Sequence, residues 1–299
     1  MSNAIGATSL STAVKEHFRK RSTKAAFYTL HQGKLVSNTV TDIPCAYGFG
    51  PTLRSSTITA GVTAINADPT QWTGKDGYWK GDQTSRGLIG NYATEAEWDA
   101  NFAVRDGAVL VCCQVEEIPN PASANYVWAL GYAGSAGYAS HFQLRYNVGN
   151  PMQLYAKADA HVEVSNYTLD FDLITPTIVN HFALLDNRSV GKQLMSWWGE
   201  TIGTRALTAA GTPTAVDPAA FFSCRPILSG GEIDPTRLKF SVGAKYQARP
   251  TEAFSNYALN SIRRVRIFNF GQNLPTNLVE IMQGLNQSNL MDCPELLSL

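Results

Sequence analysis

The segment 260–286 constrains the fold most, because it encodes a strand, a turn and a helix in direct succession. Its first part is a run of β-branched and aromatic residues interrupted by charge, which predicts a strand with one solvent-exposed face. The apolar positions are Ile262, Val265, Ile267 and Phe268, and the interrupting charges are Arg263, Arg264 and Arg266. Turn residues follow at 270–273, so the strand is expected to end there.

The helix of this segment is predicted to start after Pro275. Thr276 can accept hydrogen bonds from the first free amides, and the charge of Glu280 suits the helix dipole. An apolar stripe at i, i+3, i+4 and i+7 is formed by Leu278, Ile281, Met282 and Leu285. A helix this short needs a sheet to pack against, so the segment predicts a sheet covered by a helix.

The rest of the chain predicts an all-β fold. Only 16% of its 299 residues are charged and 24 are glycine, a balance typical of strands joined by many turns. The clearest buried strand is 108–118, and further strands are predicted at 126–132, 142–147, 152–157, 177–185, 193–198 and 238–243. Their spacing predicts an antiparallel jelly-roll β-sandwich over residues 41–299, with the less regular segment 42–101 supplying edge strands and loops.

Residues 1–40 are predicted to form an extended or helical arm. The segment 1–34 holds six basic residues and one acidic residue, so it carries +5 of a chain whose formal net charge is zero. Residues expected to dock the arm on a partner are an apolar helical stripe and the basic residues after it, namely Leu10, Val14, Phe18, Arg19, Lys20, Arg21 and Lys24. An acidic protein surface is favoured over nucleic acid as the partner, and a solvated tail is the alternative.

The closing strand and helix start resemble those of laminin-G-like, concanavalin A-like jelly rolls. The matching residues are Ile262, Val265, Arg266, Ile267, Phe268 and Asn269, followed by Leu274, Pro275 and Thr276. Residues 180–184 (NHFAL) resemble another strand of the family, with Asn180 in place of its tryptophan, and the likeness extends over roughly residues 100–286. Arg264 stands where the family usually has aspartate. The resemblance implies the same sandwich fold.

No catalytic set is predicted. Glycosidases on this sandwich carry an ExDxxE strand, but here Glu232 and Asp234 are followed by Arg237 in a glycine- and proline-containing loop, which indicates a solvated turn. The five histidines are scattered without zinc-binding spacing, and His181 is expected to be a hydrogen-bonded histidine of the sandwich. Motifs of serine hydrolases and of phosphate-binding loops are also missing, so the chain is predicted not to be an enzyme.

Two binding functions remain open. Loop aromatics at Trp72, Tyr78 and Trp79 could stack on a sugar, although filling the sandwich is the more ordinary role for such rings. No cofactor is expected. The alternative is a bound Ca²⁺ ion, because the same stretch contains suitable oxygen ligands at Asn66, Asp68, Asp76 and Asp82.

The cysteines and the absence of targeting signals bear on location. Five cysteines without CxxC spacing predict reduced thiols, and Cys112 and Cys113 are expected on opposite faces of one strand. No apolar run of about 18 residues and no signal peptide is found, so three Asn-x-Ser/Thr triplets are expected to be chance. The chain is therefore predicted to be made in the cytoplasm.

Laminin-G-like jelly rolls with an attachment arm resemble structural proteins of tailed-phage virions, such as capsid decoration, head or collar fibre and tail-fibre proteins. The resemblance implies a non-enzymatic virion component that assembles in the host cytoplasm, contacts other capsid or tail proteins and forms a homo-oligomer. The first alternative is a lectin-like module for host-surface glycans, and the second is a degenerate glycoside hydrolase. No membrane partner is expected.

Overall fold

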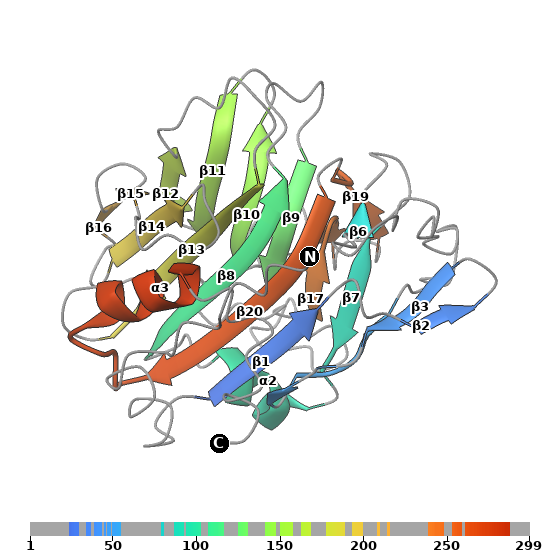
Figure 1. The fold of residues 1–299 in the computed structure, drawn as a ribbon, viewed down its shortest axis with the longest axis horizontal. Helices are drawn as coiled ribbons and strands as arrows, with labels where there is room; N and C mark the ends of the chain where they lie inside the picture. Colours follow the sequence, from blue (N-terminus) through green and yellow to red (C-terminus); the bar gives the residue numbers. More distant parts are fainter. Residues whose placement is uncertain are drawn as a thin grey trace, which may run out of the picture.

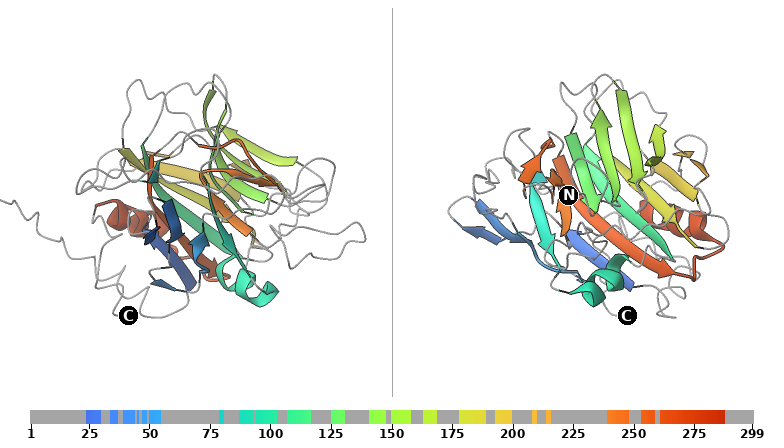
Figure 2. Two further views of the ribbon diagram at one scale, coloured as in Figure 1. Left: turned by 90° about the vertical axis from the view of Figure 1, so that its right-hand side faces the viewer. Right: turned by 180° about the vertical axis from the view of Figure 1, so that it is seen from behind.

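The fold was analysed in a computed structural model of the chain. The structure describes these residues: 24–29, 34–36, 39–43, 45, 47–48, 50–54, 79–80, 87–92, 94–102, 107–116, 125–130, 141–147, 150–157, 163–168, 178–188, 193–199, 208–209, 214–215, 239–247, 253–258 and 261–287. Within them, two sheets of nine strands each lie face to face, as the edge-on view in Figure 2 shows. Every strand pair in both sheets is antiparallel, which confirms the predicted all-β sandwich.

Sheet A carries the closing strand near its centre (Figure 1). Its path is β15 (Thr208–Ala209), β14 (Gln193–Gly199), β13 (Ile178–Asp186), β8 (Ala108–Glu116), β20 (Ser261–Gly271), β1 (Lys24–Thr29) and β4 (Tyr47–Gly48). Two further strands join this path, β16 (Thr214–Ala215) beside β14 and β6 (Trp79–Lys80) beside β20.

Sheet B forms the second layer, and a separate two-stranded ribbon adjoins it. The path of sheet B is β12 (Glu163–Thr168), β11 (Asn150–Lys157), β10 (His141–Asn147), β9 (Asn125–Leu130), β17 (Lys239–Val242), β7 (Leu88–Asn91), β5 (Leu53–Arg54), β3 (Thr39–Ile43) and β2 (Lys34–Val36). The ribbon pairs β18 (Lys245–Gln247) with β19 (Ala253–Ser255).

Alternation along β8 divides its side chains between two apolar layers. Val109, Val111 and Cys113 face the core between the sheets, where Trp128 and Phe142 meet them from sheet B. Leu110 and Cys112 belong instead to a second cluster on the outer face of sheet A. The two neighbouring cysteines therefore point to opposite faces, as predicted, and neither forms a disulfide.

Helix α3 (Leu278–Gln287) covers the outer face of sheet A, as the closing segment predicts (Figure 1). Its stripe of Leu278, Ile281, Met282 and Leu285 is buried in the outer cluster. The helix begins later than expected, because the amide of Ile281 donates to the carbonyl of Asn277 at 3.1 Å. Asn277, rather than Thr276, thus precedes the first helical residue.

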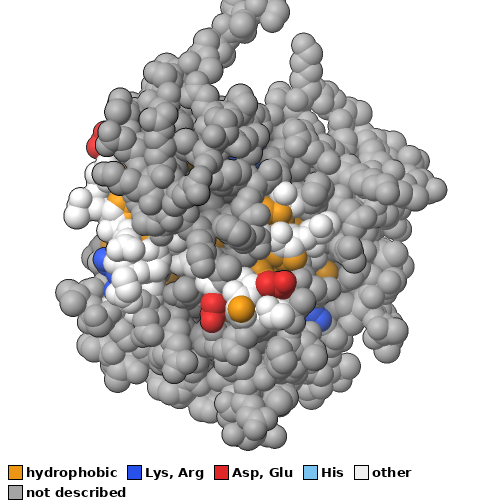
Figure 3. All heavy atoms as spheres, turned by 90° about the horizontal axis from the view of Figure 1, so that it is seen from below, with side chains coloured by type: hydrophobic (Ala, Val, Ile, Leu, Met, Phe, Trp, Pro, Cys, Tyr) orange, Lys and Arg blue, Asp and Glu red, His pale blue; other side chains and the backbone are white. Residues whose placement is uncertain are grey.

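A second helix, α2 (Glu95–Phe102), differs from the strands and loops expected in 42–101. Trp98 and Phe102, one turn apart, are its buried residues and pack with ring centroids 4.6 Å apart. Phe102 also contacts Phe240 of sheet B at 5.9 Å, so α2 closes the lower end of the core (Figure 1). The space-filling view of this end shows acidic side chains beside a small apolar area (Figure 3), and Glu97 of α2 is exposed.

Strand β1, which lies within the predicted arm 1–40, pairs with β20 along its whole length, and β2 and β3 belong to sheet B. The prediction that the arginine-bearing face of the closing strand is exposed to solvent is wrong. Arg264 is 0% exposed and Arg266 is 2% exposed, because further parts of the fold cover the outer face of sheet A.

Candidate functional site

A β-bulge in β9 places a tyrosine on the outer face of sheet B. Leu144 of β10 pairs with Trp128, but Arg145 pairs with Tyr126, so Val127 has no opposite residue. This extra residue shifts Tyr126 away from the core face that Trp128 occupies. Bulges often re-aim a side chain next to a binding or active site.

Two cations meet at the ring of Tyr126. Nη1 of Arg145 donates to the Tyr126 hydroxyl at 3.3 Å, and Nζ of Lys245 lies 5.9 Å from the ring centroid. Tyr126 as a whole is only 4% exposed, whereas Arg145 and Lys245 are half-buried. A cation over the face of an aromatic ring within about 6 Å is attracted by the ring's quadrupole. The site therefore holds donors at its surface above a buried aromatic floor.

Two residues with left-handed backbone hold the strand end in place. Gly243 (φ 74°) donates its amide to the carbonyl of the bulged Val127 at 2.8 Å. Asn256 (φ 49°) accepts from the amide of Tyr126 at 3.1 Å through its carbonyl. Among the described residues, Asn256 is the single non-glycine residue with positive φ. Such strain of about 1–3 kcal/mol persists where the surrounding structure enforces it and is concentrated at ligand sites.

Gln143 adds a buried carboxamide to the same face. Its neighbours Phe142 and Leu144 point into the core, so Gln143 points to the outer face together with Arg145. It is 0% exposed, and neither its Oε1 nor its Nε2 has a hydrogen-bond partner within the part of the chain that the structure describes. We call Tyr126, Gln143, Arg145, Lys245 and Asn256 together the Tyr126 site.

The Tyr126 site is rich in hydrogen-bond donors. A guanidinium has five N–H donors, an ammonium has three, and a carboxamide adds two donors and an acceptor oxygen. These groups suit a ligand that presents several oxygen acceptors. Three of the five residues lie on β9 and β10, strands of the sheet that faces the viewer when the molecule is seen from behind (Figure 2).

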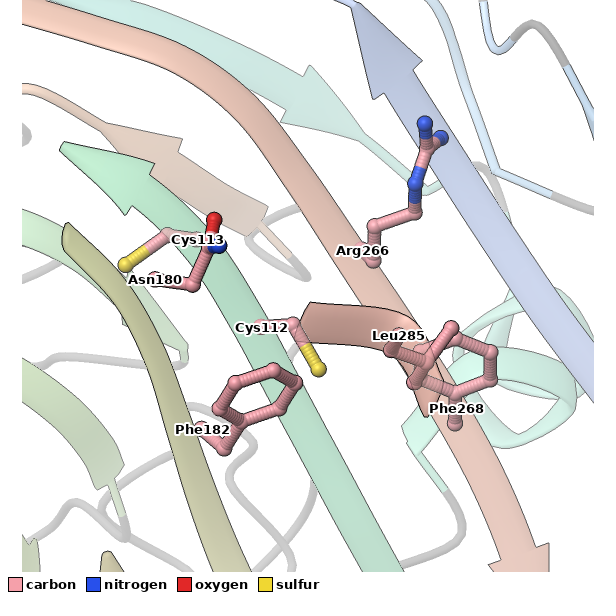
Figure 4. A pocket seen from close by; sticks show the side chains of 7 residues that line it. All are labelled: Cys112, Cys113, Asn180, Phe182, Arg266, Phe268 and Leu285. Atoms are coloured by element: carbon pink, nitrogen blue, oxygen red, sulfur yellow. The ribbon is translucent and has the colours of Figure 1, made fainter. Parts of the chain in front are cut away.

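A second polar region lies on the outer face of sheet A beside α3. Figure 4 shows its pocket, which is lined by Cys112, Asn180, Phe182, Arg266 and Leu285 among others. The cavity volume is about 10 Å³, enough for one water molecule and too small for an organic ligand.

One hydrogen bond at this pocket joins α3 to the sheet, and a second joins two strands of the sheet. The side chain of Asn180 donates to Oδ1 of Asn286 on α3 at 2.9 Å, and Arg264 donates to Oε1 of Gln114 at 3.3 Å. Asn180, Asn286, Gln114 and Arg264 are all buried. We therefore assign this region a structural role.

The thiol in this pocket is not activated. Burial raises the pKa of the Cys112 thiol well above its ordinary value, Cys113 raises it further, and the charge of Arg266 opposes both. Nucleophilic cysteines need a lowered pKa, because the thiolate is the reactive form. Cys112 is thus a core residue rather than a nucleophile.

Most site residues predicted from the sequence lie outside the described residues. These include the arm residues Leu10, Val14, Phe18, Arg19, Lys20 and Arg21, the aromatic residues Trp72 and Tyr78, the calcium candidates Asn66, Asp68, Asp76 and Asp82, and the carboxylates Glu232 and Asp234. Lys24 begins β1 opposite Asn269, and Trp79 begins β6 opposite Ile262.

The remaining predicted residues have structural places. His181 is 1% exposed in β13, which agrees with the predicted sandwich histidine. Two of the three glycosylation triplets start at buried asparagines, Asn187 and Asn286, so neither can carry a glycan in the folded protein. Among the described residues, no three His, Cys, Asp or Glu side chains gather as metal ligands, and no helix has the length and apolarity to cross a membrane.

Sequence reasoning missed the Tyr126 site. The alternation of Phe142, Gln143, Leu144 and Arg145 was a usable signal, because it places two polar side chains on one face of a strand. The bulge has no comparable signal. The segment 125–130 (NYVWAL) is apolar throughout its centre, so its sequence does not show which face Tyr126 occupies.

Comparisons with known proteins concern the fold. Neither a protein-family model nor a curated protein matches the sequence. Among solved structures, a Trypanosoma rangeli sialidase is 12% identical with a TM-score of 0.47, and the match covers 90% of this chain and 33% of the sialidase. The chain thus spans about a third of the length of that enzyme.

Two further similar structures are binding domains. The carbohydrate-binding module CBM40 of a Ruminococcus gnavus sialidase, bound to α2,3-sialyllactose, is 13% identical with a TM-score of 0.40, and the match covers 69% of this chain and 96% of the module. The binding domain of botulinum neurotoxin DC is 9% identical with a TM-score of 0.46, covering 91% of this chain and 52% of that one. The class that the sheet topology defines is the all-β sandwich.

Proposed function

We propose that this protein is a carbohydrate-binding module that receives a glycan at the Tyr126 site. The observation that carries the proposal is the irregular end of β9, where a bulge and two left-handed residues hold Tyr126 on the outer face of sheet B. Regular strand pairing would satisfy the backbone hydrogen bonds of β9 with less strain. The irregularity is therefore best explained by the side chain that it positions, Tyr126. It positions a phenol between two cations.

The chemistry of these side chains favours a sugar. Carbohydrates present many hydroxyl oxygens, and recognition sites for small ligands combine aromatic surface with a few fixed polar groups. Arg145 and Lys245 are half-buried, and their charged ends lie at Tyr126, where they can donate to a ligand. Nucleic acid fits less well, because binding to it relies on a series of phosphate contacts rather than on one compact site.

We further propose that the module is not catalytic. Glycoside hydrolysis generally needs two carboxyl groups flanking the scissile bond, one as acid and the other as base or nucleophile. The five residues of the Tyr126 site include no carboxylate. A bound glycan would therefore be held there without a group to protonate its leaving oxygen.

The test is binding to a glycan array followed by calorimetry on the best glycan. Arg145→Met and Lys245→Met keep the apolar stems but remove the donors, and each is expected to weaken binding at least tenfold, or about 1.4 kcal/mol. Lys239→Met is the matched control. Lys239 is also a half-buried lysine, but it begins β17, whereas Lys245 follows the end of that strand. No glycan bound by the wild type, or equal binding by all variants, would overturn the proposal.

Anchoring in a virion through the N-terminal arm stays a separate prediction. Because β1 begins at Lys24 and pairs with β20, a truncation that tests the arm has to stop before this strand. Removing residues 1–22 is expected to abolish incorporation into particles while glycan binding and the circular dichroism spectrum are retained. Normal incorporation of the truncated chain would refute the arm's role.

A further inference from the structure

Gln143 is the least explained polar residue of the sandwich. Its carboxamide is completely buried on the outer face of sheet B, and both of its polar atoms lack hydrogen-bond partners in the described chain. Ser241 of β17 lies in the same row two strands away, on the other side of Ala129; it is also 0% exposed, but its hydroxyl donates to the carbonyl of Ala244 at 2.9 Å. The face can therefore satisfy a buried polar group, and it does not satisfy Gln143.

An unsatisfied carboxamide destabilises the folded chain. Its amide and carbonyl lose their hydrogen bonds to water on folding and gain none in return. An apolar side chain of similar shape at this position would avoid that loss, as Phe142 and Leu144 do on the other face. Polar groups held at a cost to stability are typical of binding sites, where the ligand supplies the missing partners.

We infer that Gln143 recognises two adjacent hydroxyl groups of the bound sugar. This inference rests on the proposed glycan binding and names the chemical group that the site reads. A carboxamide presents one acceptor and one donor side by side. Two hydroxyls on neighbouring carbons present the complementary pair, one donating to Oε1 while the other accepts from Nε2. A carboxylate or phosphate offers acceptors alone and would leave Oε1 unsatisfied.

The position of Gln143 makes this reading compatible with the Tyr126 site. Arg145 follows two residues later on the same strand and face, so the two side chains project side by side. Arg145 is half-buried, whereas Gln143 is completely buried. Contact between the sugar hydroxyls and the carboxamide therefore requires the groups that cover Gln143 to move, so association is expected to be slower than for an open site.

The experiment uses methyl glycosides of glucose, galactose and mannose together with their 2-, 3- and 4-deoxy analogues. For the wild type, removing either hydroxyl of one adjacent pair is expected to weaken binding at least tenfold, because a buried group of Gln143 then stays unpaired. Gln143→Met is expected to bind the parent glycoside at least tenfold more weakly and to lose this discrimination. Gln272→Met, at an exposed glutamine in the turn after β20, is the matched control.

Stability separates this role from a structural one. Gln143→Met is expected to unfold at the same denaturant concentration as the wild type or a higher one, since it removes an unsatisfied buried group. If this variant does not fold, the side-chain amide resonance of Gln143 in the wild type provides the readout. It is expected to shift on titration with the parent glycoside and not with the inactive deoxy analogue.

Different results overturn the two proposals. If the wild type binds a glycoside and Arg145→Met weakens it, but deoxy analogues bind like the parent, glycan binding stands and the role of Gln143 is refuted. A destabilised Gln143→Met that keeps its discrimination also refutes it, and shows that the amide is structural or holds a fixed water. If the wild type binds no glycan on the array or in the panel, both proposals fail together.

Discussion

Gly199 offers a sharp test of how α3 is held on the sandwich. A Cβ atom at this position would lie 2.5 Å from Nδ2 and 2.6 Å from Oδ1 of Asn286. Asn286 is completely buried on α3 and accepts from the Asn180 side chain at 2.9 Å. The substitution Gly199→Ala therefore forces the Asn286 amide away from its partner.

The expected cost has two parts. Inserting a methyl group into a packed interior costs about 1–3 kcal/mol. Displacing Asn286 leaves the buried amide of Asn180 without its acceptor, which adds about 1–3 kcal/mol. We expect Gly199→Ala to lower the free energy of unfolding by about 2–6 kcal/mol, a large share of the usual stability of a domain.

Chemical denaturation followed by tryptophan fluorescence and circular dichroism measures this effect. Gly271→Ala is the comparison, since Gly271 has φ 56° and nothing within 4 Å of an added Cβ, so only backbone strain of about 1–2 kcal/mol is expected. In an Asn286→Ala background the added methyl group has room, and Gly199→Ala is expected to cost less than about 1 kcal/mol. The reasoning would be refuted if Gly199→Ala alone were as stable as the wild type, or if Gly199→Ala lowered the free energy of unfolding equally in the wild-type and Asn286→Ala backgrounds.

Further predictions concern the core. Tyr28→Phe removes a hydrogen bond of 2.8 Å to the carbonyl of Pro51 and is expected to cost about 0.5–1.5 kcal/mol in urea unfolding. Burial raises the pKa of Tyr28 and Tyr92 well above the ordinary 10.0, so the contribution of these two tyrosines to stability should be constant below pH 10 and fall above it, and Tyr92→Phe should reduce that fall. Mass spectrometry after pulsed alkylation should find Cys112 unmodified until the protein unfolds; rapid labelling of native protein would contradict its burial. Trp98→Ala should cost about 3–5 kcal/mol by detaching α2 from the aromatic core, and an unchanged melting temperature would contradict that packing.

The strands of the sandwich were predictable because their signal is local. The buried run at 108–118 became β8 (Ala108–Glu116), and the predicted strand at 142–147 became β10 (His141–Asn147). Helix α2 was missed because its sequence, EAEWDANF, has just two large apolar residues, Trp98 and Phe102. Two apolar residues one turn apart are too few to outweigh the glycines and turn residues around them.

Burial on the outer face of sheet A could not be read from the closing strand. Arg264 and Arg266 alternate with Val265 and Ile267 in the way expected of a strand with one exposed face. This alternation establishes that the arginines and the apolar residues lie on opposite faces of the strand. The structure confirms this, since Val265 and Ile267 lie in the core. Whether the second face meets water depends on which distant segments cover it, and no local pattern records that.

The sequence by itself determined the all-β class, eight of the eighteen strands that the structure describes in the two sheets, and the amphipathic helix that follows the closing strand. Each of these depends on the period of apolar residues within one segment. Tertiary structure decided the Tyr126 site. Its residues come from β9, β10, β18 and the segment after β19, and a one-residue bulge sets the face on which Tyr126 lies. Register between strands follows from the pairing energy of whole sheets, so the place where Tyr126, Arg145 and Lys245 meet exists only in the folded chain.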